Sequence, residues 1–209
     1  LFLSYSNGDI EPEICRILKA HQRDASLHHV PNRGRDIGPL LSELGLQLDR
    51  NYKIHGHLHT KKSVLIDGGT AERWREFLLT NLIGSQKHPM ADIILSALNN
   101  DDRNLGLVFP DDPGCLGWTD NYAHAETLAR RLHLTSLPQA INFPVGTMFW
   151  ARQGALSSLY NLELSWDDYP SEPLGYDGTM LHAIERLIPQ ICLASGKRYA
   201  VTHVPGFSR

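Results

Sequence analysis

The sequence has little cysteine, no excess of charge and no long apolar run. Its 209 residues include three widely spaced cysteines, at 15, 115 and 192, which favour free thiols in a reducing compartment over a disulfide framework. No apolar run approaches the ~20 residues that span a bilayer, and no secretory signal pattern is present. With 20 basic and 23 acidic residues, the net charge is −3, which excludes a broadly basic nucleic-acid binder.

Common cofactor and hydrolase motifs are also missing. The chain lacks the phosphate-loop pattern GxxxxGK[ST], the dinucleotide pattern GxGxxG, the nucleophile elbow GxSxG and the zinc patterns HExxH and CxxC. Hydrophobic residues make up 42% and charged residues 21% of the chain, so the composition is that of a globular protein. No repeat or linker divides it, and we expect one domain over 1–209. Because the first residue is leucine, we also expect a fragment of a longer polypeptide.

Strand-like and helix-like segments alternate along the chain. The expected strands are 1–6, 27–30, 52–58, 105–109, 143–151 and 199–204, and the expected helices are 10–21, 36–48, 70–82, 89–98, 121–132, 153–160 and 179–193. Pro189 lies inside the last expected helix, where a proline could end it before 193. The alternation favours an α/β sheet with helices on both faces, in which ligands bind beyond the carboxyl ends of strands.

Residues 31–39 place two arginines around a glycine at an expected strand-to-helix turn. Arg33 and Arg35 carry planar donors suited to phosphate, and Gly34 would let a ligand approach the backbone. A helix that begins near Asp36 would add the positive end of its dipole. The same residues also fit a capped turn with two solvated arginines, and the local sequence leaves both interpretations open.

Residues 55–63 combine three histidines with a lysine pair. In a strand, His55, His57 and His59 share one face, as a three-histidine zinc site requires. Core or surface histidines that bind their neighbours are the alternative. Lys61 and Lys62 follow the strand and could neutralise a diphosphate, although such a pair also fits a solvated loop.

The last third of the chain holds a further set of polar candidates. Gly146 interrupts an aromatic strand, which indicates a bulge, a ligand close to the backbone or simply core packing. Asp177 stands at a helix entrance, where it can be an N-cap or a general base. His182, Glu185 and Arg186 follow at spacings that place them on one face of that helix.

Read in order, five segments resemble elements of the rhamnan synthesis F family. The matching letters are NRGRDIGP at 32–39, HTKKS at 59–63, WR at 74–75, GTMFWAR at 146–152, and DGT with HAIER at 177–179 and 182–186. Each element is short, but five in the same order over nearly the whole chain are specific. His55 and His57 lie outside the match, which lowers the support for a zinc site.

The resemblance implies a GT-A-like three-layer α/β sandwich, the fold of nucleotide-diphospho-sugar transferases. Such folds open with one more strand and helix, so we expect segment 1–6 to be the second strand and the first βα unit to be missing here. They usually carry Asp-x-Asp after the fourth strand, where Mg²⁺ or Mn²⁺ meets the diphosphate. The strand at 52–58 is instead followed by His-Thr-Lys-Lys, so we expect no metal. Asp111 and Asp112 form the competing metal site.

The family members resemble glycosyltransferases of bacterial rhamnose-containing polysaccharide and O-antigen (lipopolysaccharide) assembly. The resemblance therefore implies a rhamnosyltransferase that uses dTDP-L-rhamnose and a glycan or polyprenyl-linked acceptor, with Asp177 as the base and Glu172 in reserve. The implied donor side is Asn32, Arg33, Gly34, Arg35, Asp36, His59, Thr60, Lys61 and Lys62. The implied acceptor side is Gly146, Thr147, Trp150, His182, Glu185 and Arg186.

The expected location is the cytoplasm, with the membrane contacted only peripherally or through other domains, and no nucleic acid is expected as a partner. Two other functions stay open from the sequence. One is a non-catalytic glycan-binding or scaffold module of a larger polysaccharide-assembly protein. The other is a metal-dependent hydrolase built on His55, His57 and His59.

Overall fold

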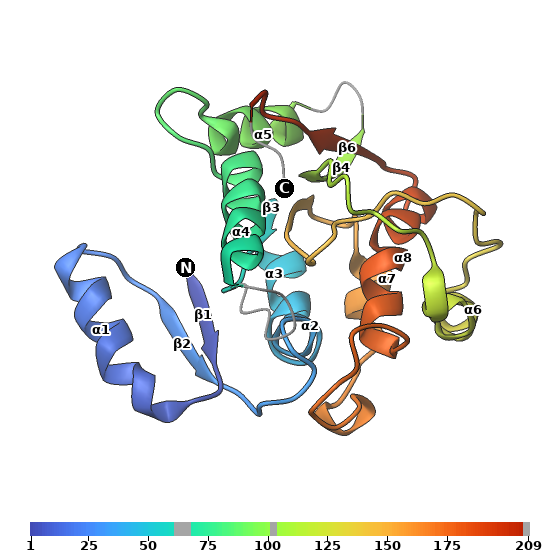
Figure 1. The fold of residues 1–209 in the computed structure, drawn as a ribbon, viewed down its shortest axis with the longest axis horizontal. Helices are drawn as coiled ribbons and strands as arrows, with labels where there is room; N and C mark the ends of the chain where they lie inside the picture. Colours follow the sequence, from blue (N-terminus) through green and yellow to red (C-terminus); the bar gives the residue numbers. More distant parts are fainter. Residues whose placement is uncertain (61–67, 101–103, 207–209) are drawn as a thin grey trace.

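A computed structural model describes residues 1–60, 68–100 and 104–206 and shows a mixed α/β protein (Figure 1). The strands are β1 (Phe2–Tyr5), β2 (Ser26–His29), β3 (Ile54–His57), β4 (Leu105–Pro110), β5 (Phe149–Arg152) and β6 (Arg198–Thr202). The helices are α1 (Glu11–Ala20), α2 (Ile37–Pro39), α3 (Gly45–Asn51), α4 (Gly68–Leu82), α5 (Met90–Asn99), α6 (Tyr122–Arg131), α7 (Ser157–Tyr160) and α8 (Met180–Ala194). A π-helical segment, Leu40–Leu44, joins α2 to α3.

The strands form two sheets. The larger sheet has the order β3-β5-β4-β6, in which β5 is antiparallel to both neighbours and β4 and β6 are parallel. The smaller sheet pairs β1 with β2 in parallel, and α1 connects these two strands. In Figure 1 this β1–α1–β2 unit lies at one side of the molecule. The predicted α/β class is confirmed, in the form of a mixed sheet.

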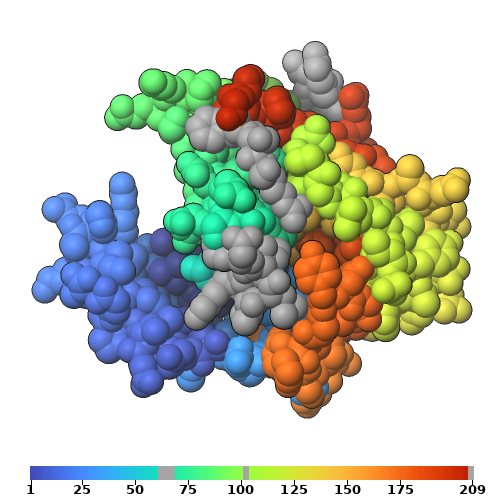
Figure 2. Space-filling view, viewed as in Figure 1, coloured from blue at the N-terminus to red at the C-terminus, as the bar shows by residue number. Residues whose placement is uncertain are grey.

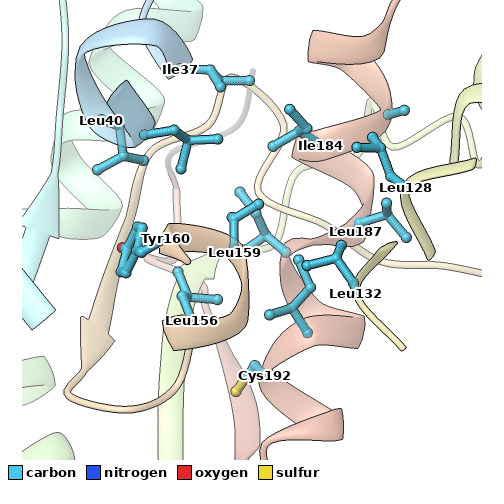
Figure 3. Packing of buried hydrophobic residues seen from close by; sticks show 14 of the residues in the cluster. Ile37, Leu40, Leu128, Leu132, Leu156, Leu159, Tyr160, Ile184, Leu187 and Cys192 are labelled. Atoms are coloured by element: carbon cyan, nitrogen blue, oxygen red, sulfur yellow. The ribbon is translucent and has the colours of Figure 1, made fainter. Parts of the chain in front are cut away.

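Helices cover both faces of the larger sheet. Alternate residues of its central strands therefore face two separate cores. Leu107 and Phe109 of β4 belong to the core formed with α6, α7 and α8, whereas Val108 belongs to the core formed with α4 and α5. This alternation is the expected result of a strand's two-residue repeat. Figure 3 shows the first core, where Leu128 of α6 and Leu187 of α8 lie side by side.

Three details differ from the sequence prediction. The aromatic strand is shorter than expected: β5 begins at Phe149, and residues 144–147 form a turn in which Thr147 N donates to Pro144 O at 2.7 Å. Gly146 has φ +90° at the third position of this turn, the conformation a type II turn requires. Pro189 does not end the last helix, which continues to Ala194 because its apolar face is packed in the core. The helix expected over 36–48 contains the π-helical segment.

No helix in the described ranges has both the length and the apolar character needed to cross a bilayer.

Candidate functional site

A small polar pocket lies where three segments that are distant in the sequence meet. Its volume is about 80 Å³, room for one phosphate-sized group and too little for a whole nucleotide sugar. The lining residues come from the turn before α2, the turn before β5 and the first turns of α8: Arg35, Asp36, Ile37, Gly146, Thr147, Leu181, His182 and Glu185. Six of these eight are predicted site residues, and they include members of both the donor and the acceptor sets.

Two turns bring unusual backbone conformations to the pocket. Arg35 has φ +50° and follows Gly34 at +73°, and Thr147 has φ +57° and follows Gly146 at +90°. Non-glycine residues adopt positive φ at a cost, and such conformations concentrate at functional sites. The pocket is therefore bordered on two sides by backbone that the surrounding structure holds in place.

Close packing explains the glycines of the NRGRDIGP element. A Cβ atom on Gly34 would lie 2.8 Å from Gly38 Cα and 2.9 Å from the ring of Tyr169. A Cβ atom on Gly38 would lie 2.5 Å from the carbonyl oxygen of Arg33. The turn that carries Arg35 and Asp36 thus folds so tightly that neither glycine has room for a side chain.

The Gly146–Thr147 turn is held by three side chains. Glu185 Oε1 accepts from Gly146 N at 2.6 Å and from Thr147 Oγ1 at 3.4 Å. His59 Nε2 donates to Gly146 O at 2.6 Å, and His57 Nδ1 donates to Thr147 O at 2.6 Å. Because carbonyl oxygens only accept, these bonds place a proton on Nε2 of His59 and on Nδ1 of His57.

Burial keeps His57 neutral. Desolvation lowers the pKa of His57, and the nearby His59 lowers it further, while Asp36 and the backbone contact to Thr147 act in the opposite direction. His59 Nε2 lies 3.7 Å from Asp36 Oδ2, so this histidine connects the two turns. His59, which was predicted on the donor side, therefore contacts the pocket wall through the backbone carbonyl of Gly146.

The two arginines of the first turn have different surroundings. Arg33 donates from Nε to Tyr169 O at 2.8 Å and from Nη1 to Asp167 Oδ1 at 2.9 Å, and so fastens the 167–169 segment to the turn. Arg35 lines the pocket. Its guanidinium lies 3.6 Å from Glu172 Oε1 and 3.5 Å from His182 Nε2. The structure thus places only the second arginine at the pocket.

Arg186 is buried in a network with Asp177. Its side chain is 7% exposed, and it donates from Nε to Gly117 O at 2.8 Å and from Nη2 to Thr119 Oγ1 at 3.2 Å. Nη2 also lies 3.4 Å from Asp177 Oδ1, and the guanidinium carbon lies 4.8 Å from the centre of the Phe143 ring. These contacts make Arg186 a cross-link between α8 and the 117–119 segment.

Asp177 accepts hydrogen bonds from two further side chains. Thr119 Oγ1 donates to Oδ2, and Asn121 Nδ2 donates to Oδ1 at 2.6 Å. Burial alone would raise the pKa of Asp177, but these two bonds and the charge of Arg186 outweigh it and lower the pKa. A carboxylate stabilised in this way is a weak base, and Asp177 is not among the pocket-lining residues.

Glu172, the residue held in reserve as the base, and the start of α8 also contact residues of the pocket. Glu172, besides its contact with Arg35, accepts from Leu174 N at 3.0 Å. Thr179 Oγ1 caps α8 and lies 2.8 Å from His182 Nδ1. Burial lowers the pKa of His182, Asp177 opposes this shift, and the charges of Arg35 and Arg186 lower the pKa again, so the neutral ring is favoured at pH 7.

The remaining predicted residues lie elsewhere or outside the described ranges. Trp150 belongs to the core on the α4 side of the sheet and donates from Nε1 to Leu82 O at 3.0 Å, away from the pocket. Asn32 and Thr60 are exposed and do not line the pocket. Lys61 and Lys62 fall outside the residues that the structure describes.

The candidate metal ligands are held by other contacts. His55 is buried, its Nε2 lies 2.7 Å from the hydroxyl of Tyr160, and burial lowers its pKa to about 4. Asp112 accepts from Trp74 Nε1 at 2.8 Å and from Gly114 N at 2.7 Å. Among the described residues, no three His, Cys, Asp or Glu side chains are grouped so that they could hold a metal ion.

Sequence reasoning missed the part that three residues play in building the site, of which His57 was considered only as a metal ligand. His57 supports the Gly146–Thr147 turn, and its only sequence signal is the two-residue spacing to His59 on one strand face. Thr119 and Asn121, which bind Asp177, lie far from it in the sequence and carry no motif. Their role depends on a tertiary contact between the segment before α6 and the segment before α8.

The fold and the pocket together define a mixed α/β protein with a small charged pocket at the junction of three loops. A profile of the family described as Rhamnan synthesis protein F matches residues 1–197, and the chain belongs to this family. This confirms the resemblance noted in the sequence. The description of this family names rhamnan synthesis.

Curated relatives extend the comparison to longer proteins. Two proteins of Xanthomonas campestris pv. campestris, from strains B100 and ATCC 33913, each named uncharacterized protein WxcX, are 34% identical over 189 residues. The match covers 89% of this chain and 26% of each relative, so the chain spans about a quarter of their length. No solved structure matches the chain.

Proposed function

We propose that this protein is a glycosyltransferase with a GT-A-like fold. It would move a sugar, most simply rhamnose from dTDP-L-rhamnose, to a glycan or polyprenyl-linked acceptor in the cytoplasm. The observation that carries the proposal is the pocket itself, since residues of the expected donor and acceptor sides meet there. A sheet between two helix layers and membership in a rhamnan synthesis family support the same reaction class.

Arg35 is the residue proposed to bind the donor diphosphate. Its guanidinium lines a pocket whose volume of about 80 Å³ suits a phosphate, and planar guanidinium donors match phosphate oxygens. As the sugar leaves, negative charge grows on the departing diphosphate, and a fixed cation nearby lowers the energy of that state. Lys61 and Lys62, which the family resemblance assigns to the donor side, are proposed to add to this charge without a metal ion.

The base is proposed to be Asp36 instead of Asp177. Both Asp36 and Glu185 line the pocket, but Glu185 accepts from the Gly146–Thr147 turn and is engaged as a positioning group. Asp177 has its oxygens occupied by Thr119 and Asn121. In the proposed step Asp36 takes the proton of the acceptor hydroxyl as its oxygen attacks the anomeric carbon and the nucleoside diphosphate leaves.

The test combines donor binding with transfer in matched variants. Calorimetry should show dTDP-L-rhamnose bound by the wild type, and a transfer assay should give rhamnosylated acceptor in the presence of EDTA. Asp36→Asn should lower kcat at least about 100-fold with little change in donor affinity. Asp177→Asn, measured per folded molecule, should keep the wild-type kcat.

Loss of transfer in Asp177→Asn with full activity in Asp36→Asn would reverse the assignment of the base. Loss of transfer in EDTA that Mn²⁺ restores would refute the metal-free site.

A non-catalytic glycan-binding module is the second candidate. It is favoured by the internal engagement of Glu185, Asp177 and Arg186, which bind other protein groups. A scaffold of this kind should bind glycan and show no affinity for dTDP-L-rhamnose, so the calorimetric titration separates the two functions.

A further inference from the structure

The segment 174–177 is tethered on both sides of one exposed tyrosine. Arg35 Nη2 donates to Leu174 O at 3.3 Å and to Gly175 O at 3.4 Å, and Asp177 is bound by Thr119 and Asn121. Tyr176 lies between these anchors with 64% of its surface exposed. Within the described ranges no hydrogen bond or ring contact involves the Tyr176 side chain. The backbone is thus fixed while the ring faces solvent.

Two more exposed apolar side chains stand next to residues that bind Asp177 or Arg186. Tyr122 follows Asn121, which binds Asp177, and it is 44% exposed. Leu116 precedes Gly117, whose carbonyl binds Arg186, and it is 70% exposed. The Trp118 ring meets the Tyr122 ring edge-on at 6.0 Å, which fixes the Tyr122 ring. In Figure 2 the orange segment around residue 175 and the yellow-green segment around residue 120 lie side by side on this face.

This surface adjoins the pocket through Arg35, which lines the pocket and also holds the Gly175 carbonyl. A pocket of about 80 Å³ cannot contain a glycan chain, so an acceptor must continue across its rim. An amphipathic tyrosine ring on a backbone held at that rim is suited to pack against the apolar face of a sugar, because a tyrosine side chain has only two torsion angles to order on binding.

The charges around Tyr176 favour a neutral ligand. Glu172 and Asp177 flank it in the sequence, and Asp120 lies against Gly178, with its Cβ 3.4 Å from the position of a Cβ there. Glu172 is paired with Arg35 and Asp177 with Arg186, so the charges beside Tyr176 are largely balanced within the protein. Balanced charges suit an uncharged glycan, and we therefore assign this rim to the acceptor.

We propose that Tyr176, supported by Tyr122 and Leu116, forms a subsite that stacks against a sugar ring of the acceptor glycan. This inference rests on the proposed glycosyltransferase function. Within that function it identifies the acceptor as a neutral saccharide of more than one unit, with one ring at the mouth of the pocket and another on Tyr176.

The test uses an α-linked rhamnose trisaccharide and dTDP as separate probes. Saturation-transfer NMR titrations would compare wild type, Tyr176→Ala and Tyr176→Phe, with Ile93→Ala as the control because Ile93 is an exposed apolar residue of α5, 54% exposed. Tyr176→Ala should weaken trisaccharide binding about tenfold, as expected for an aromatic hot spot. Tyr176→Phe and Ile93→Ala should bind as the wild type does, and dTDP affinity should be the same in all four.

The two proposals fail in different ways. Absence of dTDP and dTDP-L-rhamnose binding, with trisaccharide binding that depends on Tyr176, would refute the transferase and keep the subsite. Trisaccharide binding that is absent in the wild type, or unchanged in Tyr176→Ala, would overturn the subsite. A loss of dTDP affinity in Tyr176→Ala would also overturn it, because the ring would then stack on the donor base.

Discussion

Glu185 of α8 accepts a hydrogen bond from the backbone N–H of Gly146, with 2.6 Å between Oε1 and the nitrogen. The contact joins residues 39 positions apart and fastens the turn before β5 to the helix on the other side of the pocket. His57 and His59 hold the carbonyl groups of the same turn from the β3 side. Both the N–H group and the carbonyl groups of this turn, which forms the pocket wall, are therefore held by hydrogen bonds.

Removing the Glu185 carboxylate should loosen this wall. In Glu185→Ala the Gly146 N–H, which is partly buried, loses its acceptor, and we expect the free energy of unfolding to fall by about 1–3 kcal/mol. Glu185→Gln keeps an oxygen acceptor and should lose clearly less. Urea denaturation measures both, with the exposed Glu126→Ala as a control. Equal stability of Glu185→Ala and the wild type would show that the contact contributes nothing to folding.

The glycines of the first turn allow a matched steric test. Gly34 and Gly196 both have left-handed backbone, with φ +73° and +78°. An added Cβ would meet Gly38 Cα at 2.8 Å in the first case and nothing within 4 Å in the second. Gly196→Ala should therefore cost about 1 kcal/mol from backbone strain, and Gly34→Ala about 1–3 kcal/mol more from overpacking. Similar unfolding midpoints for the two variants would contradict the close packing.

Most of the secondary structure could be predicted from the sequence, because strand and helix periodicities are local. The spacing of apolar residues located α4 and α8, and the run at 105–109 located β4. The β5 prediction began six residues too early because the apolar run at 143–148 is buried as a turn, and apolar content alone does not distinguish the two. The range predicted for α8 is confirmed despite Pro189, because tertiary packing of this helix outweighs the loss of one hydrogen bond.

The residues that line the pocket could be predicted in part, and their roles less so. Motif order pointed to Arg35, Asp36, Gly146, Thr147, His182 and Glu185, all of which line the pocket. The sequence offered no means to separate Arg33, which binds Tyr169 O, from Arg35, which faces the pocket. The same limit applies to Asp177, whose partners Thr119 and Asn121 are set by long-range packing.

Acid should destabilise the protein through His55. Burial lowers the pKa of His55 to about 4 in the folded state, against about 6.5 when unfolded. Between these values the unfolded chain binds the extra proton, so stability falls as the pH drops from about 6.5 to about 4, by about 3 kcal/mol in total for this group. His57 and His182, whose pKa values are also lowered, act in the same direction.

The contribution of His55 can be isolated by substitution. His55→Gln retains a group able to bind the Tyr160 hydroxyl and cannot gain a proton in this range. Urea unfolding at pH 7.5, 5.5 and 4.5 should show a weaker loss of stability in the variant than in the wild type. The same dependence on pH in both proteins would mean that His55 titrates normally in the folded state.

Arg33 and Arg35 should separate stability from ligand binding. Arg33 donates to Tyr169 O at 2.8 Å with its side chain 30% exposed, so Arg33→Ala should lower the free energy of unfolding by roughly 1–2 kcal/mol and leave dTDP affinity unchanged. Arg35 lines the pocket with weaker contacts to the protein, the shortest 3.3 Å. Arg35→Ala should therefore weaken dTDP binding at least about tenfold, as expected for the loss of a charge-assisted bond to phosphate, with a smaller effect on unfolding.

Calorimetry and urea denaturation on both variants test the pair together. Weaker dTDP binding in Arg33→Ala alone would move the diphosphate site from the pocket to the 167–169 segment, because that is where the Arg33 guanidinium lies.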